Sequence, residues 1–133
     1  MSKREYVLTL SEEQAKLLCT ACEFYARMRT GQWNELIWHC LDLSKEDFCE
    51  KRDELEEKLM EARAIAFPDL AKHIGRHYGV GKFKEADQSW EIYEVLRHKI
   101  AWTEHPEGGY GVWFDKPMPF SGTPLAKCEV KEK

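Results

Sequence analysis

The sequence of 133 residues lacks features that define several large classes of protein. No apolar run approaches the roughly eighteen residues that a membrane-spanning helix needs. The charged start of the chain, Met1–Glu5, is not followed by an apolar segment of the signal-peptide type. These absences predict a protein that binds no membrane and stays in the cytoplasm of the cell that makes it. Its five cysteines are then expected to be reduced thiols.

Motifs that would mark an enzyme are also missing. The sequence has no G-x-S-x-G nucleophile motif, no dinucleotide-binding glycine fingerprint and no signature of paired catalytic carboxylates. The run from Gly79 to Lys82 (GVGK) lacks the spacing of a phosphate-binding P-loop, and no Ser or Thr follows the lysine. The sequence therefore predicts a protein that is not an enzyme and needs no cofactor.

The spacing of apolar residues predicts a single domain, residues 1–133, built mainly from helices. Ser11 with Gln14 three residues later forms a capping box, which predicts a helix start, and Gly31 is a natural stop. Further helices are expected at about 34–41, 44–67, 68–77 and 87–102.

The chain ends have a different pattern. Residues 5–10, 110–114 and 125–130 are rich in strand formers or alternate between apolar and polar residues. We therefore expect a mainly α fold of the α+β class, with a four- to five-helix core and a small antiparallel sheet made from the two chain termini. Residues 105–133 would form an irregular, partly β segment.

Charge is distributed unevenly along the chain. Its net charge of −4 argues against sequence-specific binding of nucleic acid. The stretch from Asp42 to Glu61 contains nine acidic residues and four basic ones. From Lys72 to Lys84, called here the basic segment, there are four basic residues, two histidines and no acidic residue. This asymmetry predicts a local site for an anion.

The basic segment combines cations, aromatic rings and glycines. An arginine can hold a phosphate or carboxylate through two parallel hydrogen bonds, and glycines let backbone N–H groups approach a ligand. Tyr78 or Phe83 could stack on a base. The alternative is that the glycines are ordinary turn residues and the cations are solvated or paired with the acidic helix. The predicted ligand-binding residues are His73, Arg76, His77, Tyr78, Gly79, Gly81, Lys82 and Phe83.

Two patterns resemble metal sites without matching one. His73 and His77 stand four residues apart, but no glutamate of the metalloprotease motif follows the first histidine. Cys19 and Cys22 have C-x-x-C spacing, but they lie in the middle of a predicted helix among apolar residues. We expect no metal and interpret these cysteines as small core residues.

Four stretches together resemble small proteins encoded by bacteriophages and prophages of Firmicutes, a group without an established activity. These stretches are LTLSEEQAKLLCTACEFYARMRTGQW, FCEKRDELEEKLMEARAIAFPDL, GRHYGVGKFKEAD and YEVLRHKIAW. The resemblance implies an accessory viral protein that acts in the cytoplasm of a host bacterium and blunts host defence.

The basic segment and this resemblance lead to one functional hypothesis and one alternative. The first is a non-enzymatic binding protein, a homodimer, that sequesters a small anionic ligand such as a cyclic nucleotide immune signal. The second is an inhibitor that binds a host defence protein, through the acidic helix or through an aromatic tail. That tail contains Tyr110, Trp113, Phe114, Met118 and Phe120.

Overall fold

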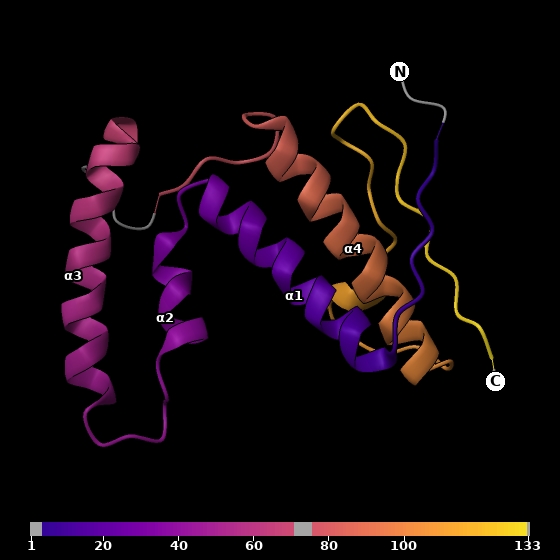
Figure 1. Cartoon of the computed structure of the whole chain (residues 1–133), viewed down its shortest axis with the longest axis horizontal. Helices are drawn as coiled ribbons and strands as arrows, with labels where there is room; N and C mark the ends of the chain where they lie inside the picture. Colours follow the sequence, from indigo (N-terminus) through magenta and orange to yellow (C-terminus); the bar gives the residue numbers. More distant parts are fainter. Residues whose placement is uncertain (1–3, 71–75, 133) are drawn as a thin grey trace.

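A computed structural model describes residues 4–70 and 76–132 of the chain (Figure 1). The described residues form four α-helices and three short 3₁₀ turns, which confirms the mainly helical prediction. In chain order they are α1 (Glu12–Arg29), η1 (Trp33–Glu35), α2 (Leu36–Cys40), α3 (Phe48–Ala66), η2 (Pro68–Leu70), α4 (Lys84–Glu104) and η3 (Val112–Phe114). None of the described helices combines the length and the apolar character that crossing a bilayer demands.

Helices α1 and α4 pack side by side and enclose the buried core (Figure 1). Cys19 of α1 and Tyr93 and Leu96 of α4 form its centre. The Cys19 thiol donates a 3.7 Å hydrogen bond to the backbone carbonyl of Tyr93. Burial raises the pKa of this thiol to about 11. A thiol with so high a pKa is almost entirely protonated near neutral pH, which agrees with a packing role for Cys19.

The ends of α1 follow the local chemistry of the sequence. Ser11 accepts a hydrogen bond from the Gln14 backbone N–H, and the Gln14 side chain accepts one from the Ser11 backbone N–H, so the predicted capping box is confirmed. The helix ends before Gly31, whose φ of 91° suits glycine. A Cβ at this position would lie 2.6 Å from Leu70 Cδ1, so the chain also needs a glycine here for space.

The hairpin of α2 and α3 forms a second layer beside the end of α1 (Figure 1). Trp38 and Phe48 join its two helices through a ring contact of 6.1 Å. Helix α3 begins at Phe48, later than the predicted start after Ser44. The difference arises because Asp42 accepts hydrogen bonds from both the backbone and the hydroxyl of Ser44, which forms a turn in place of a helix cap.

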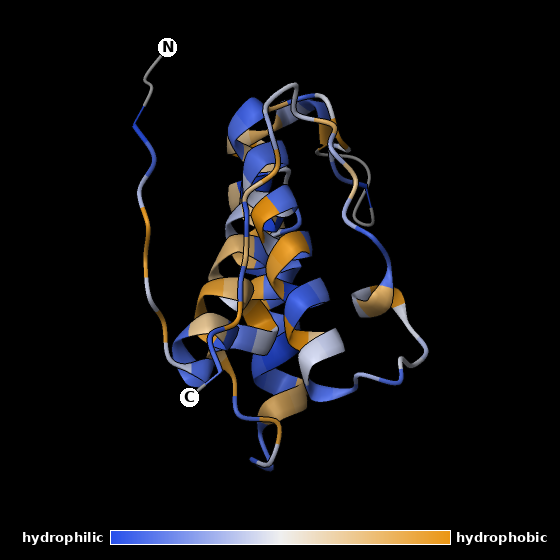
Figure 2. Ribbon diagram, turned by 90° about the vertical axis from the view of Figure 1, so that its right-hand side faces the viewer, coloured by the Kyte–Doolittle hydropathy of each residue, from blue (hydrophilic) through white to orange (hydrophobic). Residues whose placement is uncertain are grey.

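The predicted antiparallel sheet is wrong, because the described residues contain no β-strand. Residues 5–10 and 125–130 have no regular secondary structure, and no backbone hydrogen bond joins these two segments. Figure 2 shows the segment before α1 standing clear of the helices. The predicted strand at residues 110–114 is instead interrupted by Gly111, with φ 107°, and by the turn η3. An extended segment becomes a strand only when another backbone lies within hydrogen-bonding distance.

The segment after α4 is held by side chains of that helix. The Glu91 carboxylate, which is buried, accepts hydrogen bonds from the backbone N–H groups of Phe120 and Ser121 and from the Ser121 hydroxyl. The Trp102 indole N–H donates to the Phe114 carbonyl at 3.1 Å. Side-chain hydrogen bonds of this kind, and not a sheet, place the C-terminal segment against α4.

Candidate anion-binding surface

The described part of the basic segment, residues 76–83, connects η2 with α4 and is anchored at its start. The Tyr78 backbone N–H donates to the Thr30 carbonyl at 2.8 Å, which ties the segment to the end of α1. Arg63 of α3, only 2% exposed, donates to the carbonyls of Arg76, Leu70 and Gly31 at 2.8, 3.0 and 3.3 Å. This single guanidinium therefore joins α3, the turn after α1 and the basic segment.

A row of aromatic rings runs beneath the basic segment. Trp33 meets Phe67, Phe67 meets Tyr78, and Tyr78 meets Phe83, with ring centroids 5.5–5.7 Å apart and edge-to-face geometry. Such T-shaped pairs are a favoured arrangement for aromatic side chains. The row supports the segment from η1 to the start of α4.

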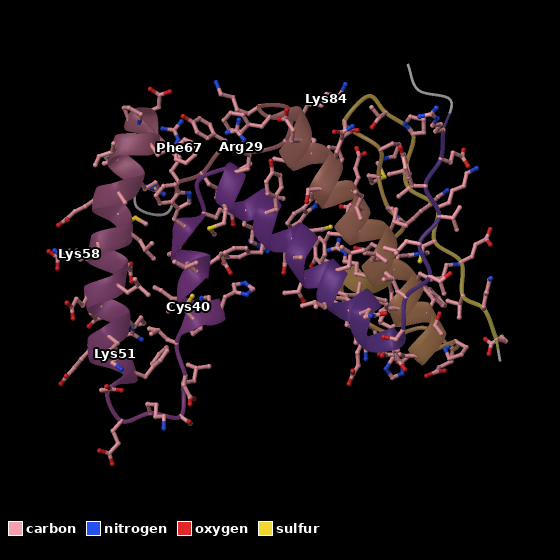
Figure 3. All side chains as sticks on the ribbon, in the orientation of Figure 1. Arg29, Cys40, Lys51, Lys58, Phe67 and Lys84 are labelled. Atoms are coloured by element: carbon pink, nitrogen blue, oxygen red, sulfur yellow. The ribbon has the colours of Figure 1, made fainter. Side chains whose placement is uncertain are left out.

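Two cations lie over rings of this row. The Arg29 guanidinium carbon is 3.9 Å from the centroid of Phe83, and the Lys82 ammonium is 5.4 Å from the centroid of Tyr78. Both distances are within the range of a cation–π interaction. Figure 3 shows Arg29 between Phe67 and Lys84, at the end of the molecule where α1 and α3 end and α4 begins. The cations are therefore positioned by aromatic rings.

In the described part of the chain, the cations of this surface form no ion pair with a carboxylate. Within residues 4–70 and 76–132, no ion pair involves Arg29, Arg76, Lys82 or Lys84. Arg76, His77 and Lys82 are exposed. The surface at this end of the molecule therefore carries positive charge that an external anion can reach.

Two carboxylates of the chain do contact polar groups of the segment. Asp87, buried in the first turn of α4, accepts the Gly81 backbone N–H at 3.0 and 3.2 Å. Asp69 accepts the Tyr78 hydroxyl at 3.2 Å. Burial, and then the charge of Asp69, raise the pKa of the Tyr78 hydroxyl. The Gly81 N–H and the Tyr78 hydroxyl are thus already hydrogen-bonded within the chain.

The structure brings most of the predicted site residues together. Arg76, His77, Gly79 and Lys82 lie on the exposed side of the segment, whereas Tyr78 and Phe83 are partly buried in the aromatic row. Gly81 has φ 92°, so its conformation requires a glycine, whereas Gly79 has no positive φ. His73 lies outside the described residues. The predicted helix to His77 does not extend over residues 76 and 77, which are irregular.

Sequence reasoning missed the two arginines that matter most to this surface. Arg29 lies 54 positions before Phe83, and Arg63 is one of several charged residues on a helix whose pattern indicates a solvated surface. One signal was present for Arg63. It falls four residues after Leu59 and three before Ala66, on the apolar stripe of α3. For Arg29 the sequence holds no such signal.

An apolar groove of about 500 Å³ adjoins the surface. Helix α1, the η1–α2 turn and α3 provide its walls, and Arg29 and Phe67 belong both to the groove and to the basic surface. The groove is lined by Tyr25, Met28, Arg29, Trp33, Leu36, Leu59 and Phe67.

The other candidate sites have plain structural roles in the described chain. Cys19 is buried and Cys22 is half-buried, and burial raises the pKa of both thiols. Across residues 4–70 and 76–132, no cluster of three His, Cys, Asp or Glu side chains could hold a metal ion. In the aromatic tail, Trp113 contacts Tyr93 and Phe114 contacts Trp102, so part of the tail covers α4.

Comparison with known proteins gives no relative on which to base the function of this surface. No protein-family model, no curated protein and no solved structure matches the chain.

Proposed function

We propose that the protein is a non-enzymatic binding protein that captures a small anionic ligand at the surface formed by Arg29, Arg76, His77 and Lys82. The main support is that Arg29 and Lys82 are held over aromatic rings, and that Arg29, Arg76 and Lys82 have no carboxylate partner in the described chain. An anion bound there would gain charge-assisted hydrogen bonds from donors that do not first have to leave an ion pair.

The proposed ligand class is a nucleotide, such as a cyclic nucleotide that signals in immunity. Arginine guanidinium and lysine ammonium groups bind phosphate well, and the rings of Phe83 and Tyr78 lie beside the cations. The resemblance to phage-encoded proteins supports a role in the host cytoplasm, where removal of such a signal would weaken host defence. His73 is part of the proposed contact set on sequence grounds, and a homodimer is part of the same proposal.

Native mass spectrometry of untagged protein tests the proposal first. The protein would be purified from cells with and without an active nucleotide-signalling defence system. Extra mass of nucleotide size in the first preparation supports capture and indicates the class of ligand. Absence of added mass from both preparations would argue against a nucleotide that is retained through purification.

Isothermal titration with cyclic AMP and with pyrophosphate then examines the residues. The variant Arg76→Ala with Lys82→Ala is expected to lower affinity about a hundredfold or more, because each of the two lost charge-assisted bonds contributes roughly 1.5–3 kcal/mol. Lys51→Ala with Lys58→Ala is the matched control, since it removes the same charge from α3, away from the surface (Figure 3). Equal loss in both variants would mean that only net charge matters and would refute a local site.

A second candidate function is inhibition of a host defence protein through α3. Glu54, Glu57 and Glu61 follow one another at spacings of three and four and are all exposed, so one face of α3 is acidic. Reversal of these three charges to lysine should abolish capture of a defence protein in a pull-down and leave nucleotide binding intact. Unchanged capture by the reversed variant would exclude this face.

A further inference from the structure

The chain exposes more surface than a monomer of its mass normally does. Its accessible surface is 10237 Å² over all 133 residues, nine of which lie outside the described ranges, for a mass of 15.7 kDa. A folded monomer of that mass exposes roughly 7,300 Å², so the excess is about 2,900 Å². A standard protein interface covers about 800 Å² on each partner, and permanent homodimers cover more. The excess is therefore large enough to supply a stable interface.

Part of this excess lies in an apolar arm, residues 4–10, before α1. Tyr6, Val7 and Leu8 are 90%, 93% and 70% exposed, although their side chains are those that proteins usually bury. No hydrogen bond joins the backbone of these three residues to the backbone of another described residue. Figure 2 shows the arm away from the helices. Three consecutive apolar side chains in this state favour a binding partner.

The groove between α1 and α3 suits such an arm. Its walls are apolar apart from Arg29, so they can bury hydrophobic side chains and offer few hydrogen bonds to a polar occupant. The arm cannot fill the groove of its own chain. Tyr6 stands five residues before Ser11 and reaches about 17 Å when extended, whereas Tyr25 stands fourteen residues after Ser11, about 21 Å along the helix.

In a dimer, the arm of one copy can reach the groove of the other. Leu17, Ala21 and Met28 recur at steps of four and seven, on the side of α1 opposite its buried Cys19 and Ala26. Leu17 is 70% exposed and makes this face available to a partner. If two α1 helices cross antiparallel at Leu17, the start of each helix lies about 9 Å from the centre, and the arm continues about 10–17 Å beyond it.

The charges at the ends of α1 fit this antiparallel arrangement. The first turn carries Glu12 and Glu13, and the last turn carries Arg27 and Arg29. An antiparallel pair places the acidic first turn of each helix toward Arg27 in the last turn of the other, leaves Arg29 over Phe83 on the anion-binding surface, and opposes the two helix dipoles favourably. The interface is thus self-complementary, as a two-fold homodimer requires.

We propose that the protein forms a two-fold homodimer in which Tyr6, Val7 and Leu8 of each copy occupy the apolar groove of the other. Arg29 lines the groove and contacts Phe83, so each arm ends beside the proposed anion-binding surface of the partner. The inference rests on surface area, exposure and reach, and it does not depend on the identity of the ligand.

Light scattering coupled to size exclusion measures the assembly. The full chain is expected at the mass of a dimer, and Val7→Asp with Leu8→Asp at the mass of a monomer with unchanged helical circular dichroism. Ile65→Asp is the matched control, because Ile65 is 84% exposed on α3 and should leave the dimer intact. A full chain that is monomeric at about 100 µM overturns the proposal, because this concentration is well above the dissociation constants typical of dimers. An arm variant that remains dimeric overturns it as well.

Cross-linking tests the position of the arm. In a background with Cys40→Ser and Cys49→Ser, chains with Leu8→Cys and chains with Leu36→Cys would be co-expressed and mildly oxidised. A disulfide-linked pair is expected when both chains are present and not with either alone. A dimer that yields no cross-link would show that the arm lies elsewhere. Loss of nucleotide binding on Leu36→Trp in a monomeric protein would instead assign the groove to the ligand.

Discussion

The carboxylate of Glu91 on α4 accepts both the backbone N–H and the hydroxyl of Ser121, at 2.6 and 2.8 Å, across thirty positions of the sequence. The Phe120 N–H adds a third hydrogen bond to the same carboxylate, at 2.8 Å. Because Glu91 is buried, these three hydrogen bonds satisfy its carboxylate and also hold the C-terminal segment against the helix.

Replacement of Glu91 should release that segment. Glu91→Gln keeps the size of the side chain but removes the charge from the hydrogen bonds and turns one acceptor into a donor. We expect a loss of about 1–3 kcal/mol in the free energy of unfolding, measured by urea denaturation, and faster proteolysis after residue 115. Glu85→Gln, on an exposed position of the same helix, is the control and should change neither.

The same contact predicts a dependence on pH. Burial alone raises the pKa of Glu91, but the hydrogen bonds from Phe120 and Ser121 outweigh it and leave the pKa below its ordinary value. A carboxyl whose pKa is lower in the folded state stabilises the fold above its unfolded pKa, near 4.3, and loses this contribution as the pH falls through the lower folded value. Proteolytic release of the tail should therefore rise below about pH 4, and Glu91→Gln should flatten this dependence.

Arg63 offers a prediction that links stability to the candidate site. Arg63→Met keeps an apolar stem but leaves the carbonyls of Gly31, Leu70 and Arg76 without this donor. We expect a loss of about 2 kcal/mol or more in the free energy of unfolding, together with weaker anion binding, because the basic segment loses its anchor. Lys58→Met, on an exposed ion pair of α3, should affect neither measurement. Wild-type stability of Arg63→Met would contradict the anchoring role.

Alanine substitutions at two glycines with similar φ angles distinguish the cost of backbone strain from the cost of steric crowding. At Gly31, with φ 91°, an added Cβ would lie 2.6 Å from Leu70, whereas at Gly122, with φ 82°, it would meet nothing within 4 Å. Gly122→Ala should cost only backbone strain, about 1 kcal/mol. Gly31→Ala should cost more, because Leu70 must also move. Thermal denaturation of both variants checks the order, and equal losses would mean that the contact with Leu70 relaxes freely.

The helices of this protein follow from short-range sequence pattern. The capping box of Ser11 and Gln14, the stop at Gly31 and the helix that ends near Pro68 all depend on hydrogen bonds and steric limits within a few residues. A helix satisfies its own backbone, so local pattern is enough to place it. The exposed cations of the basic segment were equally visible in the sequence, although their role as ligand contacts stays a prediction.

Contacts between segments that are far apart in the sequence depend instead on how the helices pack. Residues 5–10 and 125–130 have the pattern of strands, but a strand needs a second backbone beside it, and the fold leaves these segments apart. The burial of Arg63 and the contact of Arg29 with Phe83 likewise depend on the packing of α1, α3 and α4. Local pattern puts Arg63 on the apolar stripe of α3, but it does not predict such contacts, because they join residues that the chain separates by 13 and 54 positions.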